Sequence, residues 1–191
     1  VVVHADLGLG GAERLVVDAC VELRSLGYEL TLYTAHHEVG RCFAETLAPG
    51  GGRAGWVRVR GGWFPRAFLG RLVALCAAVR CCLCALAALR ERRGAAVLLT
   101  DQVSAPLALC RLLFPRVRTL FYCHFPDKLL APRSTSALRA AYRAPIDWVE
   151  EATTGAAHRV LVNSAFTASV FAGTFARLHA RGVRPDVLHP A

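Results

Sequence analysis

Short apolar segments alternate with segments of helical spacing along almost the whole chain, and this alternation restricts the folds that it can adopt. Each apolar segment is four to eight residues long, as is typical of strands that are buried on both faces. Intervening helices provide the crossovers that parallel strands need. The sequence therefore predicts an α/β fold, a Rossmann-like parallel sheet with helices on both faces. We expect strands at 1–5, 28–35, 56–59, 95–100, 117–123, 159–163 and 186–189, and helices at 10–26, 68–93, 104–113, 136–156 and 165–175.

Composition narrows the class of protein. The 191 residues suit one domain, and a hydrophobic fraction of 54% excludes a disordered chain. The net charge of +9 comes almost entirely from arginine, since Lys128 is the only lysine. It suits anionic lipid or a phosphorylated substrate, although compositional arginine bias is an alternative. Because the arginines are scattered and no aromatic residues are interleaved among them, we predict no nucleic-acid partner.

The segment 72–89 allows two interpretations. Its eighteen residues hold one charged side chain, Arg80, and approach the length of about 20 apolar residues that a membrane span needs. A single pass would place strands of one sheet on opposite sides of the bilayer, so topology argues against it. The segment is then either a buried crossover helix or a helix lying in the membrane interface, with the flanking arginines at lipid phosphates.

A glycine-rich turn, D-L-G-L-G-G-A-E at 6–13, follows the first predicted strand. Gly10 and Gly11 open the next helix, where free N–H groups and the helix dipole suit a phosphate. Glu13 stands where a dinucleotide-binding fingerprint has its third glycine, and 34–37 lack the acidic ribose ligand. This disfavours NAD binding and leaves a phosphate site, or a tight turn without a ligand.

Polar and ionisable residues follow several predicted strands. In open α/β sheets, ligands bind beyond the carboxyl ends of the strands, so we expect these side chains to line one cleft. The cysteines show no paired spacing of the zinc-binding type, and no Ser-His-Asp order is evident, so we predict buried thiols and no metal site. The candidate cleft residues are His36, His37, Asp101, Gln102, His124, Asp127, Lys128, Asn163 and Ser164.

Six strings along the chain resemble the GT-B glycosyltransferases of family 4. They are G-G-A-E-R at 10–14, T-A-H-H at 34–37, D-Q-V-S at 101–104, F-Y-C-H-F-P-D at 121–127, Y-R-A-P-I-D-W at 142–148 and V-N-S at 162–164. The resemblance covers nearly the whole chain. It is strongest to the members that add α-1,3- and α-1,6-linked mannose during assembly of the dolichol-linked oligosaccharide.

The resemblance implies a reaction and a place in the cell. The reaction is a retaining transfer of mannose from GDP-mannose, without a required metal, to a dolichyl-pyrophosphate-linked oligosaccharide. The reaction would take place at the cytosolic face of the endoplasmic reticulum membrane. Residues 1–191 would form the N-terminal, acceptor-side domain, and the donor-binding domain would follow. The lack of an initial Met likewise suggests a fragment.

The resemblance also implies roles for particular residues. Gly10 and Gly11 would approach the donor diphosphate, and His124 would orient a sugar hydroxyl or stabilise developing charge. Asn163 and Ser164 would line the same cleft. Glu13 would contact the acceptor or cap its helix, and we favour the cap. Two alternatives remain: a family 4 enzyme with a different sugar nucleotide or lipid acceptor, and a Rossmann-like binding module without catalysis.

Overall fold

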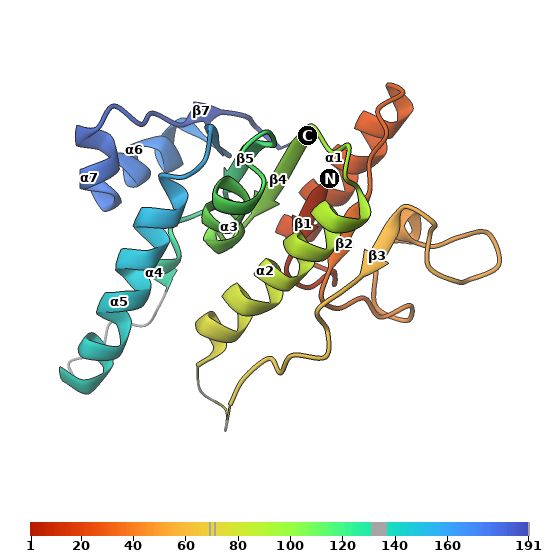
Figure 1. Ribbon diagram of the computed structural model, residues 1–191, viewed down its shortest axis with the longest axis horizontal. Coiled ribbons are helices and arrows are strands. Elements are labelled where there is room, and N and C mark those ends of the chain that lie inside the picture. Colours follow the sequence, from red (N-terminus) through yellow and green to blue (C-terminus); the bar gives the residue numbers. More distant parts are fainter. Residues whose placement is uncertain (69, 71, 131–136, 191) are drawn as a thin grey trace.

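A computed structural model describes all residues except 69, 71, 131–136 and 191 (Figure 1). Its described part contains a seven-stranded sheet in which every neighbouring pair is parallel, in the order β3-β2-β1-β4-β5-β6-β7. The predicted parallel α/β sheet is therefore confirmed. The strands are β1 Val2–His4, β2 Leu32–Thr34, β3 Val57–Val59, β4 Val97–Asp101, β5 Arg118–Cys123, β6 Arg159–Val162 and β7 Asp186–Val187. The helices are α1 Gly11–Ser25, η1 Ala44–Thr46, α2 Val73–Glu91, α3 Ala105–Leu113, α4 Asp127–Leu130, α5 Ala137–Thr154, α6 Ala165–Thr174 and α7 Ala176–Ala180.

The strand order reverses direction beside β1. From β1 the chain passes outward to β2 and β3, and α2 then carries it back so that β4 pairs with the other side of β1. The carboxyl ends of β1 and β4 therefore flank the topological switch point, which is where open α/β sheets bind ligands. The fold alone therefore predicts a ligand site between the carboxyl ends of β1 and β4.

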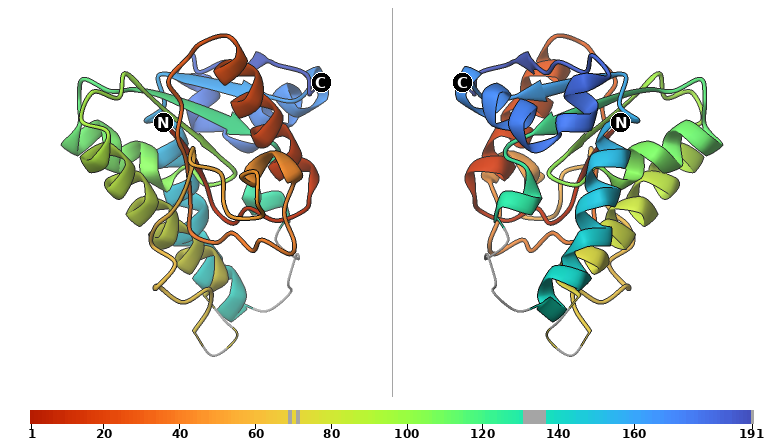
Figure 2. Two further views of the ribbon diagram at one scale, coloured as in Figure 1. Left: turned by 90° about the vertical axis from the view of Figure 1, so that its right-hand side faces the viewer. Right: turned by 90° about the vertical axis from the view of Figure 1, so that its left-hand side faces the viewer.

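Helices cover both faces of the sheet, as the sequence predicts. Val2 packs with Val16 and Val17 of α1, whereas Val3 packs with Leu89 of α2. Successive strand residues point to opposite faces, so α1 and α2 lie on opposite sides of the sheet. Leu107 of α3 belongs to a third cluster that also includes residues of β5, β6, α6 and α7. Figure 2 shows α1 separated by the sheet from the layer that contains α2, α3 and α5.

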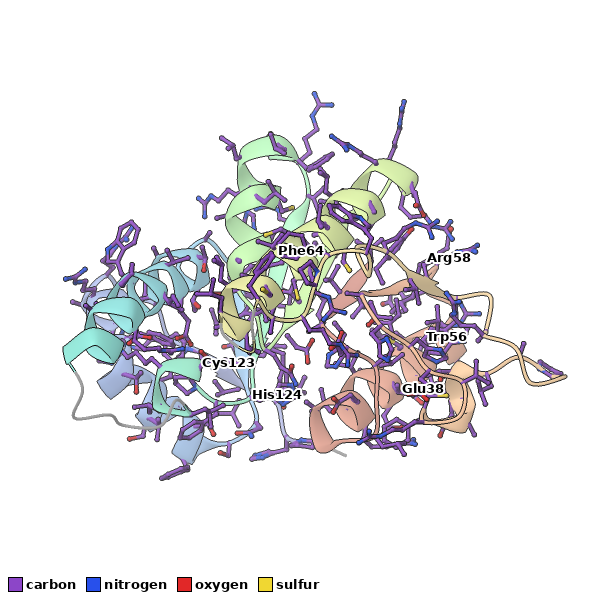
Figure 3. All side chains as sticks on the ribbon, turned by 90° about the horizontal axis from the view of Figure 1, so that it is seen from below. Glu38, Trp56, Arg58, Phe64, Cys123 and His124 are labelled. Atoms are coloured by element: carbon purple, nitrogen blue, oxygen red, sulfur yellow. The ribbon has the colours of Figure 1, made fainter. Side chains whose placement is uncertain are left out.

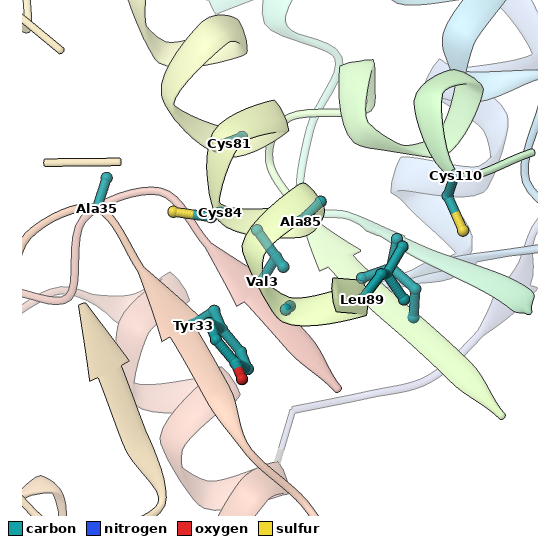
Figure 4. Packing of buried hydrophobic residues seen from close by; sticks show 10 residues of the cluster. Val3, Tyr33, Ala35, Cys81, Cys84, Ala85, Leu89 and Cys110 are labelled. Carbon is teal, nitrogen blue, oxygen red and sulfur yellow. The ribbon is translucent and has the colours of Figure 1, made fainter. Parts of the chain in front are cut away.

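The apolar segment 72–89 forms most of α2, which packs on β1, β2 and α3 as a crossover helix. Cys81, Cys84 and Ala85 of α2 lie against Val3 and Tyr33 in the core (Figure 4). α2 is long and apolar enough to cross a membrane by length and composition, with 39% of that window buried inside the domain. α2 is thus a crossover helix, and contact between its exposed residues and a membrane stays a prediction.

Three predicted details of the helices are wrong. The helix that we expected from Phe68 begins at Val73, after Leu72 adopts a left-handed conformation with φ 59°. Ser104 does not cap α3, because its hydroxyl contacts the Glu150 carbonyl and Thr153 of α5 instead. Pro145 neither breaks nor starts a helix and lies inside α5. The packing of α5 against α3 outweighs the one backbone hydrogen bond that a proline removes.

Candidate active site at the carboxyl edge of the sheet

Three ionisable side chains meet at the switch point. Asp101, at the end of β4, lies between His4 at the end of β1 and His124 just beyond β5. Its carboxylate oxygens are 2.8 and 2.9 Å from Nδ1 of His4, and one of them is 3.1 Å from Nε2 of His124. The side chains of His4 and Asp101 are fully buried, whereas that of His124 is 22% exposed. A buried charged pair therefore stands directly behind a histidine that a ligand can reach.

Opposite charges stabilise each other inside this cluster. Burial alone would lower the pKa of His4, but the charge of Asp101 and the hydrogen bond to it raise that pKa from 6.5 to about 10. Burial would likewise raise the pKa of Asp101, and the charge of His4 and the hydrogen bonds from both histidines bring it below its ordinary value. At neutral pH, His4 is therefore a buried imidazolium paired with an ionised Asp101.

His124 is held from several directions. Asp101 binds Nε2 of its ring, and Asn163 donates from Nδ2 to its backbone carbonyl at 3.3 Å. Its ring lies 4.8 Å from that of Tyr122, between centroids. Seen from below the view of Figure 1, His124 lies near the middle of the molecule, between α1 and the α4–α5 side (Figure 3). The histidine that the sequence predicted as catalytic is therefore fixed in place at the centre of the carboxyl edge.

The glycine turn lies beside this cluster. Gly10 is the N-cap of α1 in an extended conformation, and the Glu13 carboxylate folds back over it, so a Cβ on Gly10 would collide with that carboxylate. A Cβ on Gly11 would meet nothing within 4 Å. The chain's own packing therefore does not require Gly11 to be glycine, which leaves room there for a ligand. The first N–H groups of a helix lack intrahelical acceptors and are available to it.

Glu13 connects the turn to the cluster. Its carboxylate lies 3.9 Å from Nε2 of His4, and this contact, followed by its own backbone N–H, lowers the pKa of Glu13. The carboxylate folds back over Gly10, and the predicted cap stays a prediction. The contact with His4 is an addition that the sequence did not indicate.

The turn is anchored on its other side by arginine. Arg80 of α2 is buried and pairs with Asp6 at 2.8 Å, and Arg66 lies 3.3 Å from the same carboxylate. The one charge in the apolar segment 72–89 therefore holds the strand–helix turn that carries Gly10 and Gly11. This explains why an otherwise apolar helix contains an arginine.

His36 and His37 support the turn from β2. The carbonyl of His36 accepts a 2.8 Å hydrogen bond from the Leu7 N–H. The His37 ring binds Thr46 through Nε2 at 2.9 Å, and burial, followed by Arg53 and His36, lowers its pKa. The His37 side chain therefore points into the η1 loop, and its predicted contact with a ligand stays a prediction.

Gln102 directly follows Asp101 and is exposed with φ 57°, a left-handed conformation that is costly for a non-glycine residue. Such strain tends to gather at functional sites. Gln102 is therefore an exposed residue directly after the buried cluster, and its predicted contact with a ligand stays a prediction.

Asp127 and Lys128 turn toward α5 and α6. Asp127 accepts hydrogen bonds from Arg143, and Lys128 binds the Thr174 carbonyl and lies 5.2 Å over the Phe175 ring. Lys128 also lines a separate surface pocket of about 300 Å³ with Asp147, Trp148, Glu151, Thr174, Ala176 and Arg177. The contacts of Asp127 and Lys128 are thus made outside the His4–Asp101–His124 cluster, and their role in the cleft stays a prediction.

The side chains of Glu150 and Ser164 accept hydrogen bonds from the first N–H groups of α4 and α6, respectively. Glu150 accepts from the N–H groups of Asp127 and Lys128 at 2.7 and 3.0 Å, and burial raises its pKa to about 7. Ser164 accepts from the Thr167 N–H at 3.1 Å as the N-cap of α6. The side chain of Asn163 reaches back to His124, so the β6 end positions the catalytic candidate.

The sequence missed His4, which lies within a strand read as wholly apolar. The only available signal was an imidazole placed among valines, where a buried polar group needs a partner. The cysteines behave as predicted: all eight are free, six are buried, and burial raises the pKa of Cys20, Cys84 and Cys123 to about 12. Within the described residues, no group of His, Cys, Asp and Glu side chains has an arrangement that could hold a metal ion.

A doubly wound parallel sheet with a charged cluster at its switch point, beside a glycine turn, defines a Rossmann-like domain with one candidate ligand site. The chain belongs to glycosyltransferase family 4, whose family model matches residues 9–184. It is 48% identical over 191 residues to the alpha-1,3/1,6-mannosyltransferase ALG2 of Mus musculus. The matched region covers 98% of this chain and 44% of that relative. The corresponding protein of Dictyostelium discoideum is 45% identical, over 99% of the chain and 43% of the relative.

The fold is also similar to that of solved glycosyltransferases. The structure of Phytolacca americana UGT2 complexed with UDP-2fluoro-glucose and pterostilbene matches with a TM-score of 0.51 at 11% identity, over 98% of this chain and 52% of that one. At this identity the likeness concerns the fold. The chain spans less than half the length of the curated relatives named above.

Proposed function

We propose that this chain is the acceptor-side domain of a retaining mannosyltransferase. The enzyme adds α-1,3- and α-1,6-linked mannose from GDP-mannose to a dolichyl-pyrophosphate-linked oligosaccharide, at the cytosolic face of the endoplasmic reticulum. The observation that carries the proposal is the 48% identity to a mannosyltransferase over 98% of the chain. The geometry supports it, because a fixed histidine and a glycine turn share the switch point.

The residues of the site suit transfer from a sugar nucleotide. The leaving group is a diphosphate, so negative charge grows on it as the glycosidic bond breaks, and hydrogen-bond donors must meet that charge. The N–H groups at Gly10 and Gly11 supply donors where no side chain blocks the approach. His124, with its exposed edge, binds a hydroxyl of the transferred sugar. No metal enters this scheme, in keeping with the resemblance.

A chimera tests the proposal. This chain is joined to the C-terminal part of the mouse relative and assayed with GDP-mannose and a lipid-pyrophosphate oligosaccharide. We expect mannose transfer with both linkages. Transfer from another sugar nucleotide, or to another lipid acceptor, would favour a different family 4 activity. Binding of GDP-mannose without any transfer would favour the non-catalytic binding module.

The membrane contact that we propose is confined to one end of α2. Trp63, Phe68, Val73 and Leu75 are 78, 47, 58 and 48% exposed, and Phe64 stacks edge-to-face with Trp63 and Phe68. Exposed aromatic rings favour the membrane interface. The far end of α2 is buried against the sheet, so among the described residues of this region the start of α2 and residues 63–68 are the ones proposed to meet lipid.

Flotation with anionic phospholipid vesicles tests this contact. We expect the Trp63→Ser, Leu75→Gln double variant to float several-fold less than the unaltered chain. Leu112→Gln, Leu113→Gln is the matched control, because these leucines of α3 and its end are 78 and 51% exposed and should leave flotation unchanged. Equal flotation of all three proteins would count against the proposed contact.

A further inference from the structure

The buried pair behind His124 has a geometry that packing alone does not explain. His4 lies at the end of a strand whose other residues are valines, and its Nε2 is buried without a hydrogen-bond partner among the described residues. Replacing a buried ion pair by apolar side chains is often neutral or stabilising, so such a pair is weak evidence for a stabilising role. Its position behind the candidate catalytic residue suggests another task.

The hydrogen bonds determine which nitrogen of His124 carries a proton. An ionised carboxylate only accepts hydrogen bonds, so Nε2 of His124, 3.1 Å from Asp101, must be the donor. The two ring nitrogens of an imidazole flank one carbon, Cε1, and their hydrogen-bonding directions diverge. With Nε2 turned into the core, Nδ1 is the nitrogen that faces away from Asp101, and in the neutral ring it is an acceptor.

His4 in turn determines the state of Asp101. Nδ1 of His4 donates to both carboxylate oxygens, at 2.8 and 2.9 Å, and this fork fixes the plane of the carboxylate. The same hydrogen bonds, together with the charge of His4, favour the ionised, acceptor-only form of the fully buried Asp101. Without a hydrogen-bond donor at this position, Asp101 could rotate or take up a proton, and its hold on Nε2 of His124 would be lost.

We infer that His4 is a positioning residue for the transfer reaction: acting through Asp101, it fixes His124 in the Nε2–H form and so presents Nδ1 to a hydroxyl of the sugar substrate. The inference rests on the proposed function for its substrate, but the arrangement of protons can be measured without it. Glu13 extends the chain of contacts from His4 to the glycine turn.

Two variants of His4 separate hydrogen bonding from bulk packing. His4→Asn keeps an N–H donor near the position of Nδ1, and His4→Leu removes it. In the chimera we expect His4→Asn to retain kcat within about tenfold and His4→Leu to lose on the order of 10²-fold, as for loss of one charge-positioning group, with KM changed little in either. His179→Asn, on α7, is the matched control and should leave kcat unchanged.

The proton positions are read directly from ¹⁵N shifts of the histidine rings in this 191-residue chain. We expect His124 to be protonated at Nε2 in the unaltered chain and in His4→Asn. In Asp101→Asn the carboxamide oxygen should accept from Nδ1–H of His4, which leaves the NH₂ group to donate to Nε2 of His124. His124 should therefore switch to the Nδ1–H form, and a wrong tautomer of this kind is very costly in serine proteases.

Each outcome is decisive. If His124 is protonated at Nδ1 in the unaltered chain, or keeps its Nε2 proton in Asp101→Asn, the inference is wrong whatever the enzyme does. Unchanged kcat in a folded His4→Leu chimera also overturns it. If His4→Leu does not fold, the ring shifts of His4→Asn and Asp101→Asn still decide. If the chimera transfers no mannose while the shifts behave as expected, the proposed function fails and the positioning of His124 stands.

Discussion

Replacing His4 should remove a pH dependence of stability that the buried pair creates. The pKa of His4 is raised from 6.5 to about 10, so the folded chain keeps a proton that the unfolded chain releases. The stabilisation is therefore complete below pH 6.5 and is lost as the pH rises toward 10. Each unit of pKa shift corresponds to about 1.4 kcal/mol, so the unfolding free energy should fall by about 2 kcal/mol between pH 7 and 8.5 from this group alone.

The comparison with His4→Asn isolates this contribution. Glu150, with its pKa raised to about 7, loses its stabilising contribution mainly below this window, and the buried thiols begin to lose theirs only above their ordinary pKa of 9.0. Both are present in the unaltered chain and in the variant, so they cancel in the difference between the two unfolding free energies. Because His4 is buried, solvent screening does not reduce the effect substantially.

The assay is urea unfolding of the two chains at pH 7.0, 7.5, 8.0 and 8.5. We expect the difference in unfolding free energy to decrease steadily with pH, by about 2 kcal/mol over the series. A difference that stays constant within about 0.5 kcal/mol would refute the reasoning, because it would mean that His4 is neutral in the folded chain and that Asp101 has no cationic partner.

Three further substitutions address the rest of the site. Gly11→Ala should leave the unfolding free energy of the chain unchanged or raise it by up to about 1 kcal/mol, since alanine favours helix. The same variant should raise the KM of the chimera for GDP-mannose at least tenfold. An unchanged KM would argue against a phosphate at Gly11. His124→Ala should lower kcat of the chimera by on the order of 10²-fold, and unchanged turnover would remove it from the catalytic residues. Ser164→Ala should cost about 1 kcal/mol in urea unfolding by removing the α6 cap, whereas an effect no larger than a few tenths would show that the cap contributes little.

The strands and most helices could be predicted because hydrophobic periodicity is local. The seven strands lie at the expected positions, and the glycine turn opens α1 as its residues indicated. Helix ends were less predictable where a side chain has a distant partner. The sequence predicts Ser104 as a helix cap, but its hydroxyl donates to the carbonyl of Glu150 in α5, 46 residues away.

The centre of the site was predictable only in part, because it depends on strand register. Asp101 and His124 follow strands and could be chosen for that reason. His4 contributes because Val3 pairs with Thr100, which places the next residues of β1 and β4 side by side. No local pattern encodes a pairing across 97 residues. Conversely, Lys128 follows β5 closely, but α4 turns it toward α6.

The placement of buried charge argues that the carboxyl edge is a functional surface. Arg80 and Asp101 are both buried, and each has its partner at the end of β1, in Asp6 or His4. Taking charges out of water costs free energy that apolar side chains of similar volume would not incur. A chain selected for stability alone would have no reason to concentrate that cost at one strand end. The two pairs instead hold the glycine turn and the His124 ring, which are the groups that contact the sugar nucleotide in the proposed function.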